Sequence, residues 1–312
     1  MNPHDSFAHQ WGLFIKDNLP SPLSIDIVGT VAKLGSKVTK YSIGDHVFGI
    51  GNPTIPDMKG TQEYAILEAK FSAKVPEGTS EDEAATLTLN PFTAYIALFH
   101  KQGLDLPAPY PDNKPDFDYA AQSLFVVGGG TACGKYIVQY AKYAGIGKII
   151  ITASLSSEKL LKSLGATHVI DRHLSDDEVD KHVRAIVGDD LIWAVDCKGR
   201  RPGEQTLGAK ALSNTKKGTL TVLTNSGTVD ETMIGEKKAG YERKPMIAFP
   251  FREPDASECY WQSLPQWIKE GTIKPTPFSV VEGLDETKIN EVFNAYRDGK
   301  LLTKPQVHVR GA

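Results

Sequence analysis

Residues 123–154 read SLFVVGGGTACGKYIVQYAKYAGIGKIIITAS, and this stretch decides the fold class. The apolar run at 124–127 predicts a buried strand, and a glycine-rich turn follows it. Apolar residues then recur at helical spacing over 135–143, and 148–152 form a second apolar run. Strand, turn, helix and strand in this order predict a βαβ unit with two parallel strands.

The same alternation continues on the C-terminal side of this stretch. The further elements that we expect are helices over 156–164 and 180–187 and strands over 168–170, 191–195 and 219–223. Apolar strands between amphipathic helices are typical of a doubly wound parallel sheet, which helices cover on both faces. The predicted fold class is therefore α/β, with a Rossmann-type sheet.

Residues 22–75 have a different pattern, in which short β-like runs alternate with turns. The runs that we expect to form strands lie at 25–31, 46–50 and 62–66. Strands at this spacing predict a β-rich, barrel-like unit. Ser80, which three acids follow, is typical of a helix N-cap, so we predict a helix from there to about residue 99.

Length and composition limit the possible functions. A chain of 312 residues fits about two domains, and 40% hydrophobic with 23% charged residues exclude wholesale disorder. The net charge of -3 gives no sign of a nucleic-acid partner, and no apolar run is long enough to cross a membrane. The N-terminus lacks the pattern of a secretory signal, and the 3 scattered cysteines form no disulfide framework. We therefore expect a cytoplasmic protein.

The turn after the first strand of the βαβ unit is the most informative motif. It consists of Gly128, Gly129, Gly130, Thr131, Ala132, Cys133 and Gly134. Glycines let the backbone turn tightly and approach a dinucleotide pyrophosphate, and the following helix offers N–H groups and a partial positive charge. The spacing G-x-G-x-x-x-G is one residue longer than the usual G-x-G-x-x-G. An ordinary glycine turn is the alternative, but the surrounding βαβ pattern favours a dinucleotide site.

The second strand ends without the acidic residue that would bind the ribose 2′-hydroxyl of NAD. The hydroxyl and cationic side chains that follow it suit a 2′-phosphate, and they are Ser154, Ser157, Lys159 and Arg172. The missing carboxylate also removes the repulsion that would exclude this phosphate. The sequence thus predicts NADPH as the cofactor. In the alternative interpretation, the serines only cap the next helix and Lys159 faces solvent.

Short motifs along nearly the whole chain occur in the order found in one family. They are Asn2-Pro3-His4-Asp5, Asp26-Ile27-Val28-Gly29-Thr30-Val31, Gly44-Asp45-His46-Val47, Gly60-Thr61-Gln62-Glu63-Tyr64, Glu83-Ala84-Ala85-Thr86-Leu87, Thr93-Ala94, the glycine turn, Leu164-Gly165-Ala166 and Val195-Asp196-Cys197. On these motifs the chain resembles the medium-chain dehydrogenases/reductases, in their zinc-independent, quinone-reductase-like branch. Within that branch it is most similar to fungal toxD-like oxidoreductases and trans-acting enoyl reductases of polyketide pathways.

The resemblance implies a GroES-like, β-barrel-type catalytic domain into which the Rossmann domain is inserted. We place the first part of the catalytic domain at 1–92, the NADP-binding domain at 93–272 and the C-terminal part of the catalytic domain at 273–312. Family members carry further β-strands before the Asn-Pro-x-Asp motif, which begins here at Asn2. We therefore expect a catalytic domain shortened at its N-terminus, through a shortened gene or a shortened gene model.

The alcohol dehydrogenases of the same superfamily hold a catalytic zinc with Cys, His and Glu side chains. In this chain the corresponding places lie near 2–5, at 25–26 and near Leu89, and none of them offers a cysteine. His4 alone cannot supply the three protein ligands that such a site needs. We therefore predict no metal. Without a Lewis acid, hydride transfer to an activated C=C bond or a quinone is favoured over alcohol oxidation.

The residues around the reacting groups follow from the resemblance. The nicotinamide would lie near Thr93 and the segment that contains Phe249 and Phe251. Relatives often have Trp-Lys or a tyrosine after the Asn-Pro-x-Asp motif as a proton donor, whereas this chain has Ser6-Phe7. The proton donor stays open, and the candidates are His4, Ser6, His9 and Thr93, or bulk water.

Three functions are compatible with the sequence, because a fold alone does not decide between them. The first is a zinc-independent, NADPH-dependent reductase of an enoyl, enone or quinone group, which the resemblance places in fungal secondary metabolism. The second is an NADPH-dependent aldehyde reductase, and the third is a non-catalytic NADPH-binding remnant. As partners we expect a small-molecule carbonyl substrate, no nucleic acid and no membrane. The chain leaves open whether the protein is a monomer or a homodimer.

Overall fold

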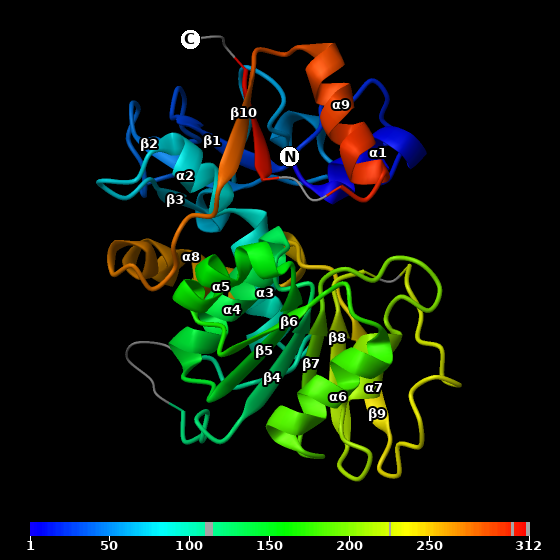
Figure 1. The fold of residues 1–312 in the computed structure, drawn as a ribbon. Helices are drawn as coiled ribbons and strands as arrows, with labels where there is room; N and C mark the ends of the chain where they lie inside the picture. The colour runs from blue at the N-terminus through cyan, green and yellow to red at the C-terminus, as the bar shows by residue number, and fades with distance from the viewer. Residues whose placement is uncertain (110–114, 225, 301–302, 310–312) are drawn as a thin grey trace. The chain divides into compact units, whose positions relative to one another are not determined.

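The chain forms two compact units in a computed structural model that describes residues 1–109, 115–224, 226–300 and 303–309 (Figure 1). The first unit contains Met1–Phe92 and Phe249–Ala312, and the second contains Thr93–Ala248. The second boundary differs from the one that we expect from sequence, since residues 249–272 belong to the first unit. Within the described ranges, no helix is both long and apolar enough to cross a membrane.

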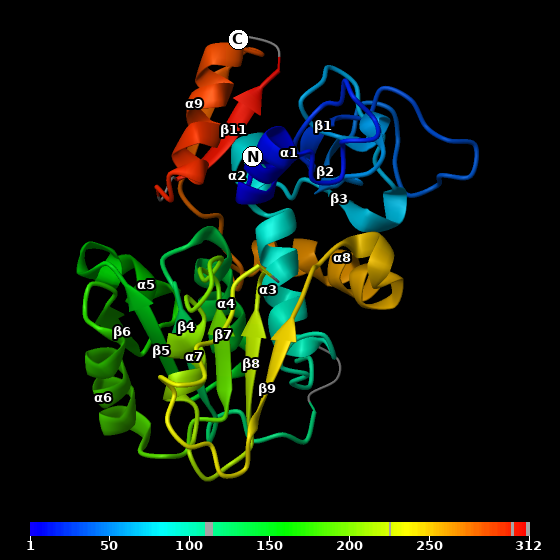
Figure 2. The same cartoon turned by 90° about the vertical axis from the view of Figure 1, so that its right-hand side faces the viewer.

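The second unit is built on a six-stranded parallel sheet (Figure 2). Its strands, in spatial order, are β6 (His168–Asp171), β5 (Lys148–Ala153), β4 (Ser123–Val127), β7 (Trp193–Asp196), β8 (Gly218–Val222) and β9 (Tyr241–Pro245). The apolar runs of the sequence form β4 to β8, which confirms the predicted α/β fold. β9 has the polar sequence YERKP because it is an edge strand, and therefore no apolar run predicts it.

Helices cover both faces of this sheet. They are α3 (Leu89–Phe99), α4 (Ala132–Ala144), α5 (Glu158–Leu164), α6 (Asp176–Val187) and α7 (Thr206–Ala211). Val183 of α6 and Leu207 of α7 share one buried cluster with Phe125 of β4. Figure 2 shows α7 in front of the sheet and α4 behind it, where the ring of Tyr140 lies 5.9 Å from that of Tyr95 in α3.

The strand order places the ends of β4 and β7 side by side. Val127, the last residue of β4, pairs with Asp196, the last residue of β7. From β4 the chain runs outwards through β5 and β6, and then returns to continue in the other direction through β7 to β9. This point is the switch point at which ligands bind in doubly wound sheets, and the glycine turn begins there.

The first unit contains an antiparallel three-stranded sheet and a parallel pair of strands. The sheet consists of β1 (Asp26–Thr30), β2 (His46–Ile50) and β3 (Ser72–Lys74), and the pair of β10 (Phe278–Glu282) and β11 (Lys304–His308). The helices are α1 (Pro3–Trp11), α2 (Glu81–Thr86), α8 (Pro254–Lys269) and α9 (Glu286–Arg297), with 3-10 turns at Pro56–Met58, Ala69–Phe71 and Pro250–Arg252. α1 packs against α9, so the two ends of the chain meet in this unit (Figure 1).

The prediction of a strand over 62–66 is wrong, because the structure has a loop there. The side-chain amide of Gln62 donates to the carbonyls of Pro56 at 3.1 Å and Lys59 at 2.7 Å, and these bonds fold the segment back on itself. Tyr64 is 69% exposed, so the alternating pattern does not mark a buried face.

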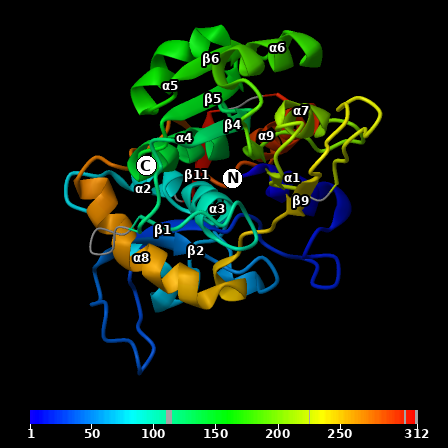
Figure 3. The same ribbon diagram turned by 90° about the horizontal axis from the view of Figure 1, so that it is seen from below.

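α8 explains why the second boundary lies before residue 249. The ring of Trp261 lies 5.7 Å from that of Phe48 in β2, and the ring of Tyr260 lies 5.2 Å from that of Phe92. Figures 1 and 2 show α8 next to β3, with which it packs, and Figure 3 shows the same helix from below. An amphipathic helix pattern does not tell which of two cores the helix covers, so sequence alone places this boundary at the wrong end of the helix.

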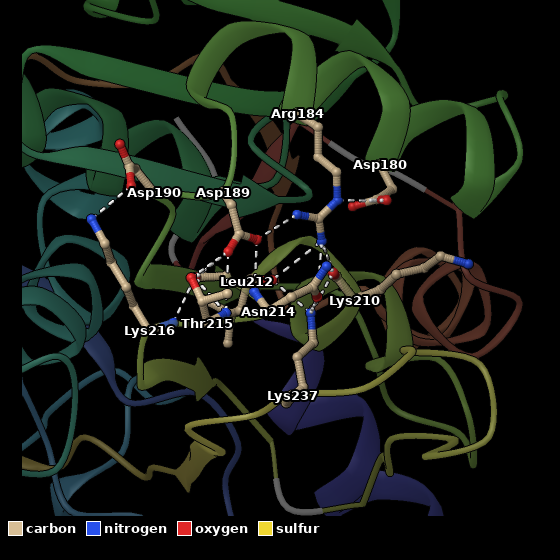
Figure 4. A network of polar contacts seen from close by, with 11 residues as sticks. Asp180, Arg184, Asp189, Asp190, Lys210, Leu212, Asn214, Thr215, Lys216 and Lys237 are labelled. Carbon is tan, nitrogen blue, oxygen red and sulfur yellow. Dashed lines mark hydrogen bonds and ion pairs between the residues drawn. The ribbon is translucent and has the colours of Figure 1, made fainter.

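A polar network joins the loops at the edge of the second unit's sheet where β7 and β8 begin (Figure 4). Arg184 of α6 forms ion pairs with Asp180 and Asp189, each at 3.0 Å. The ammonium of Lys237 donates to the Leu212 carbonyl at 2.6 Å, just after α7 ends. Burial, followed by the charge of Arg184, lowers the pKa of Lys237 to about 8. These contacts stabilise the edge opposite to the glycine turn.

Candidate cofactor site

The turn between β4 and α4 is fixed to the end of β5 by hydrogen bonds. Gly128 has a φ of 81°, a left-handed conformation that favours glycine. Its N–H donates to Thr152 Oγ1 at 2.9 Å, and the N–H of Gly129 donates to the Thr152 carbonyl at 2.9 Å. These two bonds set the direction in which the chain leaves β4.

Close contacts explain at which positions of the turn only a residue without a Cβ fits. A Cβ at Gly134 would lie 2.4 Å from the carbonyl oxygen of Gly128, and a Cβ at Gly129 would lie 2.7 Å from a side chain of β5. At Gly130 the nearest atom to a Cβ would be a methyl carbon of β5 at 3.6 Å, which is an ordinary contact. α4 therefore begins directly against the turn, as in a turn that binds a pyrophosphate, whereas Gly130 has steric room.

The first turn of α4 contributes the rest of the predicted phosphate motif. Thr131 is the N-cap, since its hydroxyl accepts the N–H of Gly134 at 3.0 Å, and Ala132 and Cys133 follow it. The half-buried Lys135 lies in the same turn, and burial lowers its pKa. A lysine here opposes the helix dipole. That unfavourable placement is the sequence signal that could have singled out Lys135 as a candidate for binding a phosphate.

The residues predicted to bind a 2′-phosphate follow the ends of β5 and β6. Ala153 pairs with Asp171, so Ser154 and Arg172 extend from neighbouring strand ends. The N–H of Arg172 donates to the Ala153 carbonyl at 2.9 Å, and its side chain is exposed. Ser157 ends the 3-10 turn Leu155–Ser157, and the exposed Lys159 is the second residue of α5. The structure thus brings Ser154 and Arg172 to one edge.

One acidic side chain also lies at this edge, and sequence reasoning did not consider it. Asp171 ends β6 opposite the last residue of β5. Its Oδ1 accepts the N–H of His173 at 3.1 Å, so the carboxylate is engaged by its own turn.

Asp196 is a second residue of the site that sequence reasoning missed. It is 1% exposed, and its Oδ1 accepts the N–H groups of Lys198 and Gly199, each at 2.7 Å. Its Oδ2 is buried and has no hydrogen-bond partner among the described residues. Burial raises the pKa of Asp196 to about 6, although the two N–H groups and the Lys198 charge oppose the shift. The sequence could have indicated Asp196 by its position, since this carboxylate ends an apolar strand next to the switch point.

Two thiols lie beside the glycine turn. Cys133 is partly exposed in the first turn of α4, and Cys197 follows β7. Burial, followed by the neighbouring Cys133 and Asp196, raises the pKa of Cys197 well above its usual value. Cys197 is therefore a poor nucleophile, because the thiolate is the reactive form.

The polar core of the first unit does not fit a catalytic zinc. Asp26, at one of the places predicted for a ligand, forms a buried ion pair with Lys304. The side chains of Asn2 and Thr88 also donate to it, at 2.7 and 2.6 Å, and so does the N–H of Leu89 at 3.2 Å. The carboxylate thus already holds an ammonium ion. In the part of the chain that the structure describes, no three His, Cys, Asp or Glu side chains gather as a metal site would need.

The candidate proton donors in α1 differ in what they contact. Ser6 is buried, and its hydroxyl donates to the Phe293 carbonyl of α9 at 2.9 Å and accepts from Gln10 at 2.8 Å. Ser6 therefore links two helices, and we do not propose it as a donor. His4 is partly buried, and its Nε2 lies 3.0 Å from Oδ1 of Asp5.

The residues predicted near the nicotinamide belong to different units. Thr93 lies in α3 and begins the second unit, whereas Phe249 and Phe251 belong to the first. The rings of Phe249 and Phe251 stack at 5.5 Å, and the ring of Phe14 meets Phe249 edge-on at 5.4 Å. The placement of all three residues around one nicotinamide stays a prediction.

Family models match both units. The model of the alcohol dehydrogenase GroES-like domain matches residues 1–77, and that of the zinc-binding dehydrogenase domain matches residues 132–251. The chain belongs to the medium-chain dehydrogenase/reductase superfamily. It is an oxidoreductase of that superfamily, whose members bind nicotinamide cofactors.

Curated relatives include the fungal enoyl reductases that the motifs predict. The chain is 24% identical to a zinc-type alcohol dehydrogenase-like protein of Staphylococcus epidermidis, over 94% of this chain and 84% of the relative. It is 28% identical to the enoyl reductase component of lovastatin nonaketide synthase from Aspergillus terreus, over 91% and 79%. A trans-enoyl reductase of Aspergillus niger is 33% identical, over 58% and 51%.

Solved structures show the same fold. A quinone oxidoreductase of Pseudomonas syringae has a TM-score of 0.75 at 20% identity, over 98% of this chain and 87% of that one. The CurK enoyl reductase has a TM-score of 0.74 at 20% identity, over 98% and 87%. A mycobacterial protein complexed with NADPH has a TM-score of 0.73 at 20% identity, over 98% and 88%.

Proposed function

We propose that this protein is a zinc-independent, NADPH-dependent reductase that transfers hydride to an activated C=C bond or a quinone. The observation that carries the proposal is the glycine turn at the switch point, where Gly134 is pressed against the Gly128 carbonyl. That contact leaves the helix N-terminus next to the strand end, which is the arrangement that binds a pyrophosphate. When NADPH is bound, it supplies the hydride.

The choice of NADPH over NADH rests on the neighbouring strand ends. Ser154 and the exposed Arg172 extend from them, with Lys159 one turn further along. An arginine binds phosphate with charge-assisted hydrogen bonds. Asp171 pairs with the last residue of β5 and is therefore the carboxylate nearest to Ser154 along the strands. Its Oδ1 accepts the His173 N–H, so this oxygen is directed towards its own turn. The mycobacterial structure that contains NADPH has the same fold.

Zinc independence rests on the donor set. Asp26 is held by Lys304, and His4 stands beside a carboxylate that the backbone of α1 already uses. The negative charge that develops on the substrate must then be met by hydrogen bonds and a proton. A chelator should leave turnover unchanged, and loss of turnover that added zinc restores would contradict this part of the proposal.

The substrate class follows from the relatives. They include an enoyl reductase and a quinone oxidoreductase, and both of these activities reduce a conjugated system that contains a carbonyl group. A small-molecule carbonyl compound with an activated double bond is therefore the substrate that we propose. We propose no nucleic acid or membrane as a partner in this reaction.

An NADPH-oxidation screen over enones, quinones and aldehydes tests the proposal. We expect oxidation of NADPH with at least one enone or quinone. Turnover with aldehydes alone would instead identify an aldehyde reductase, and tight NADPH binding without turnover across the panel would identify a non-catalytic binding protein. Gly134→Val serves as the matched control, because a branched side chain against the Gly128 carbonyl should remove any turnover that depends on the site.

A further inference from the structure

The lysine in the first turn of α4 is placed against the rule for charges at helix ends. Lys135 is the fourth residue of α4, whereas the favourable place for a cation is the last turn, where Lys142 lies. Lys135 is also half-buried, and burial lowers its pKa. In the part of the chain that the structure describes, no hydrogen bond or ion pair holds its ammonium group. Its position and its burial therefore destabilise the unliganded protein.

Lys135 also completes a sequence pattern that a Rossmann-type turn does not require. Gly129, Gly134 and Lys135 have the spacing G-x-x-x-x-G-K, which is that of the phosphate-binding loop of P-loop proteins. In that loop the lysine contacts the phosphates, and the Ser or Thr after it holds Mg²⁺. This chain has Tyr136 after the lysine, and its side chain is fully buried. The pattern thus keeps the cation for the phosphates and lacks the hydroxyl that would hold a metal.

Much of the backbone of the glycine turn is already engaged within the protein. Four N–H groups of the turn donate to protein acceptors, and they belong to Gly128, Gly129, Thr131 and Gly134. The acceptors are the hydroxyl and carbonyl of Thr152, the Gly128 carbonyl and the Thr131 hydroxyl. Glycine turns commonly bind phosphate groups through such N–H groups. Since these four are used elsewhere, a side-chain cation has to meet more of the charge of a diphosphate.

The geometry of α4 directs the Lys135 side chain towards the glycine turn. Each Cα–Cβ bond of an α-helix tilts towards the N-terminus, so a long side chain covers the turn that precedes its own Cα. For Lys135 this is the start of α4, which follows the N-cap Thr131. The start of α4 lies directly against the strand end, because a Cβ at Gly134 would be 2.4 Å from the Gly128 carbonyl oxygen. The ammonium can therefore reach a phosphate that is held at the glycine turn.

We propose that Lys135 binds the diphosphate of the dinucleotide cofactor, and that the turn takes nucleoside diphosphates as a class without Mg²⁺. This role rests on the cofactor-binding part of the proposed function and adds the residue that neutralises the diphosphate. On binding, the ammonium replaces its half-buried, unpaired state with a charge-assisted contact to a phosphate oxygen. Arg172 follows β6 and is assigned to the 2′-phosphate, so the two cations recognise different parts of the ligand.

The two cations can be separated by the choice of ligand. NADPH, NADH and ADP all contain a diphosphate, whereas adenosine 2′-phosphate contains only the phosphate that is assigned to Arg172. Removing the charge of Lys135 should therefore weaken the first three ligands by the same factor and leave the fourth unchanged. Damage to the fold of the second unit would instead weaken all four ligands.

Four variants of the full chain test the role of Lys135. Lys135→Met and Lys135→Gln are two neutral variants, Lys135→Arg keeps the charge, and Lys142→Met removes a lysine from the other end of the same helix. The measurements are the dissociation constants of NADPH, NADH, ADP and adenosine 2′-phosphate, each with and without Mg²⁺. The melting temperature of each apoprotein shows whether a variant is folded and how the charge affects stability.

We expect both neutral variants to bind NADPH, NADH and ADP about tenfold or more weakly, because each loses a charge-assisted contact. Adenosine 2′-phosphate should bind to them within about twofold of the wild type, and Lys135→Arg should keep most of the affinity for all ligands. The neutral variants should melt at or above the wild-type temperature, since a cation leaves the first turn of a helix. Lys142→Met should melt slightly lower and bind every ligand normally. Mg²⁺ should not strengthen binding.

Wild-type affinity of the neutral variants for the three diphosphate ligands would overturn the role of Lys135. An equal loss of affinity for adenosine 2′-phosphate, or a requirement for Mg²⁺, would also overturn it. These results leave the proposed function intact while the wild type binds and oxidises NADPH. NADPH binding without turnover would overturn the proposed reductase and uphold the role of Lys135 if the pattern across the ligands is found. Absence of NADPH binding by the wild type would overturn both.

Discussion

Replacing Asp196 by asparagine should stabilise the protein, and increasingly so as the pH rises. The buried carboxyl has a pKa of about 6, against 3.8 for an unperturbed aspartate in water. One pKa unit corresponds to about 1.4 kcal/mol, so the ionised group costs the folded state about 3 kcal/mol above neutral pH. Asparagine keeps an oxygen to accept the N–H groups of Lys198 and Gly199 and carries no charge.

The sign follows from the direction of the shift. Because the pKa of Asp196 is raised on folding, its neutral form favours the folded state below the unfolded pKa, and that advantage is lost as the pH rises through about 6. The free energy of unfolding of Asp196→Asn should therefore exceed that of the wild type by close to zero near pH 3.5 and by about 3 kcal/mol above pH 7, with about half of this difference present at pH 5.

Urea unfolding of the apoprotein at pH 5, 6 and 8 measures this difference. Asp230→Asn is the control, because Asp230 is exposed in the same unit and hydrogen bonds from Thr232 lower its pKa, so its replacement should give no gain at high pH. Identical pH dependence of stability in Asp196→Asn and the wild type would refute the assignment of a buried, strongly perturbed carboxyl to this strand end.

Three further predictions concern the cofactor and the core of the first unit. Arg172→Ala should weaken NADPH binding about tenfold or more and leave NADH binding unchanged, because a charge-assisted contact to the 2′-phosphate contributes about 1.5–3 kcal/mol. Titration with both cofactors measures the two dissociation constants, and equal losses of affinity would contradict this prediction. Gly134→Ala should lose at least about tenfold in NADPH affinity, because its Cβ meets backbone atoms. Gly130→Ala meets no backbone atom and should keep the wild-type melting temperature. Normal NADPH binding by a folded Gly134→Ala would show that the turn does not hold the phosphates. Lys304→Met should lower the free energy of unfolding by about 3–5 kcal/mol, because Asp26 would stay buried without its ammonium, and Asp26→Asn in the same chain should recover much of the loss in urea unfolding.

The sheet of the second unit could be predicted from sequence because its central strands are buried on both faces. Such strands are continuous apolar runs, and the helices between them have a clear period. The same reasoning fails at the polar edge strand β9 and over 62–66, where alternation arises in an exposed loop. The boundary at 272 also could not be corrected from sequence, because the apolar face of α8 does not say which core it covers.

The positions of the glycine turn and of the residues that follow β5 could be located from sequence because they are local to the βαβ unit, whereas their contacts with a cofactor stay a prediction. Other parts of the candidate sites depend on contacts between distant positions. Asp26 and Lys304 form a buried pair although nearly the whole chain separates them, and a pattern search along the sequence gives no reason to join them. The fold decides which charged side chains become buried, and the composition of the chain does not show this.

The first unit is assembled from both ends of the chain, and this affects how the protein can be synthesised. The ribosome releases β1 to β3 before the second unit, and α8, α9, β10 and β11 only after it. At roughly 5–20 residues per second, on the order of ten seconds or more pass between the two halves of one core. During that interval Phe48 lacks Trp261, and Asp26 lacks Lys304. We therefore expect the inserted unit to fold first on the ribosome, while the N-terminal segment waits with exposed strand edges and depends on chaperones until the C-terminal segment emerges.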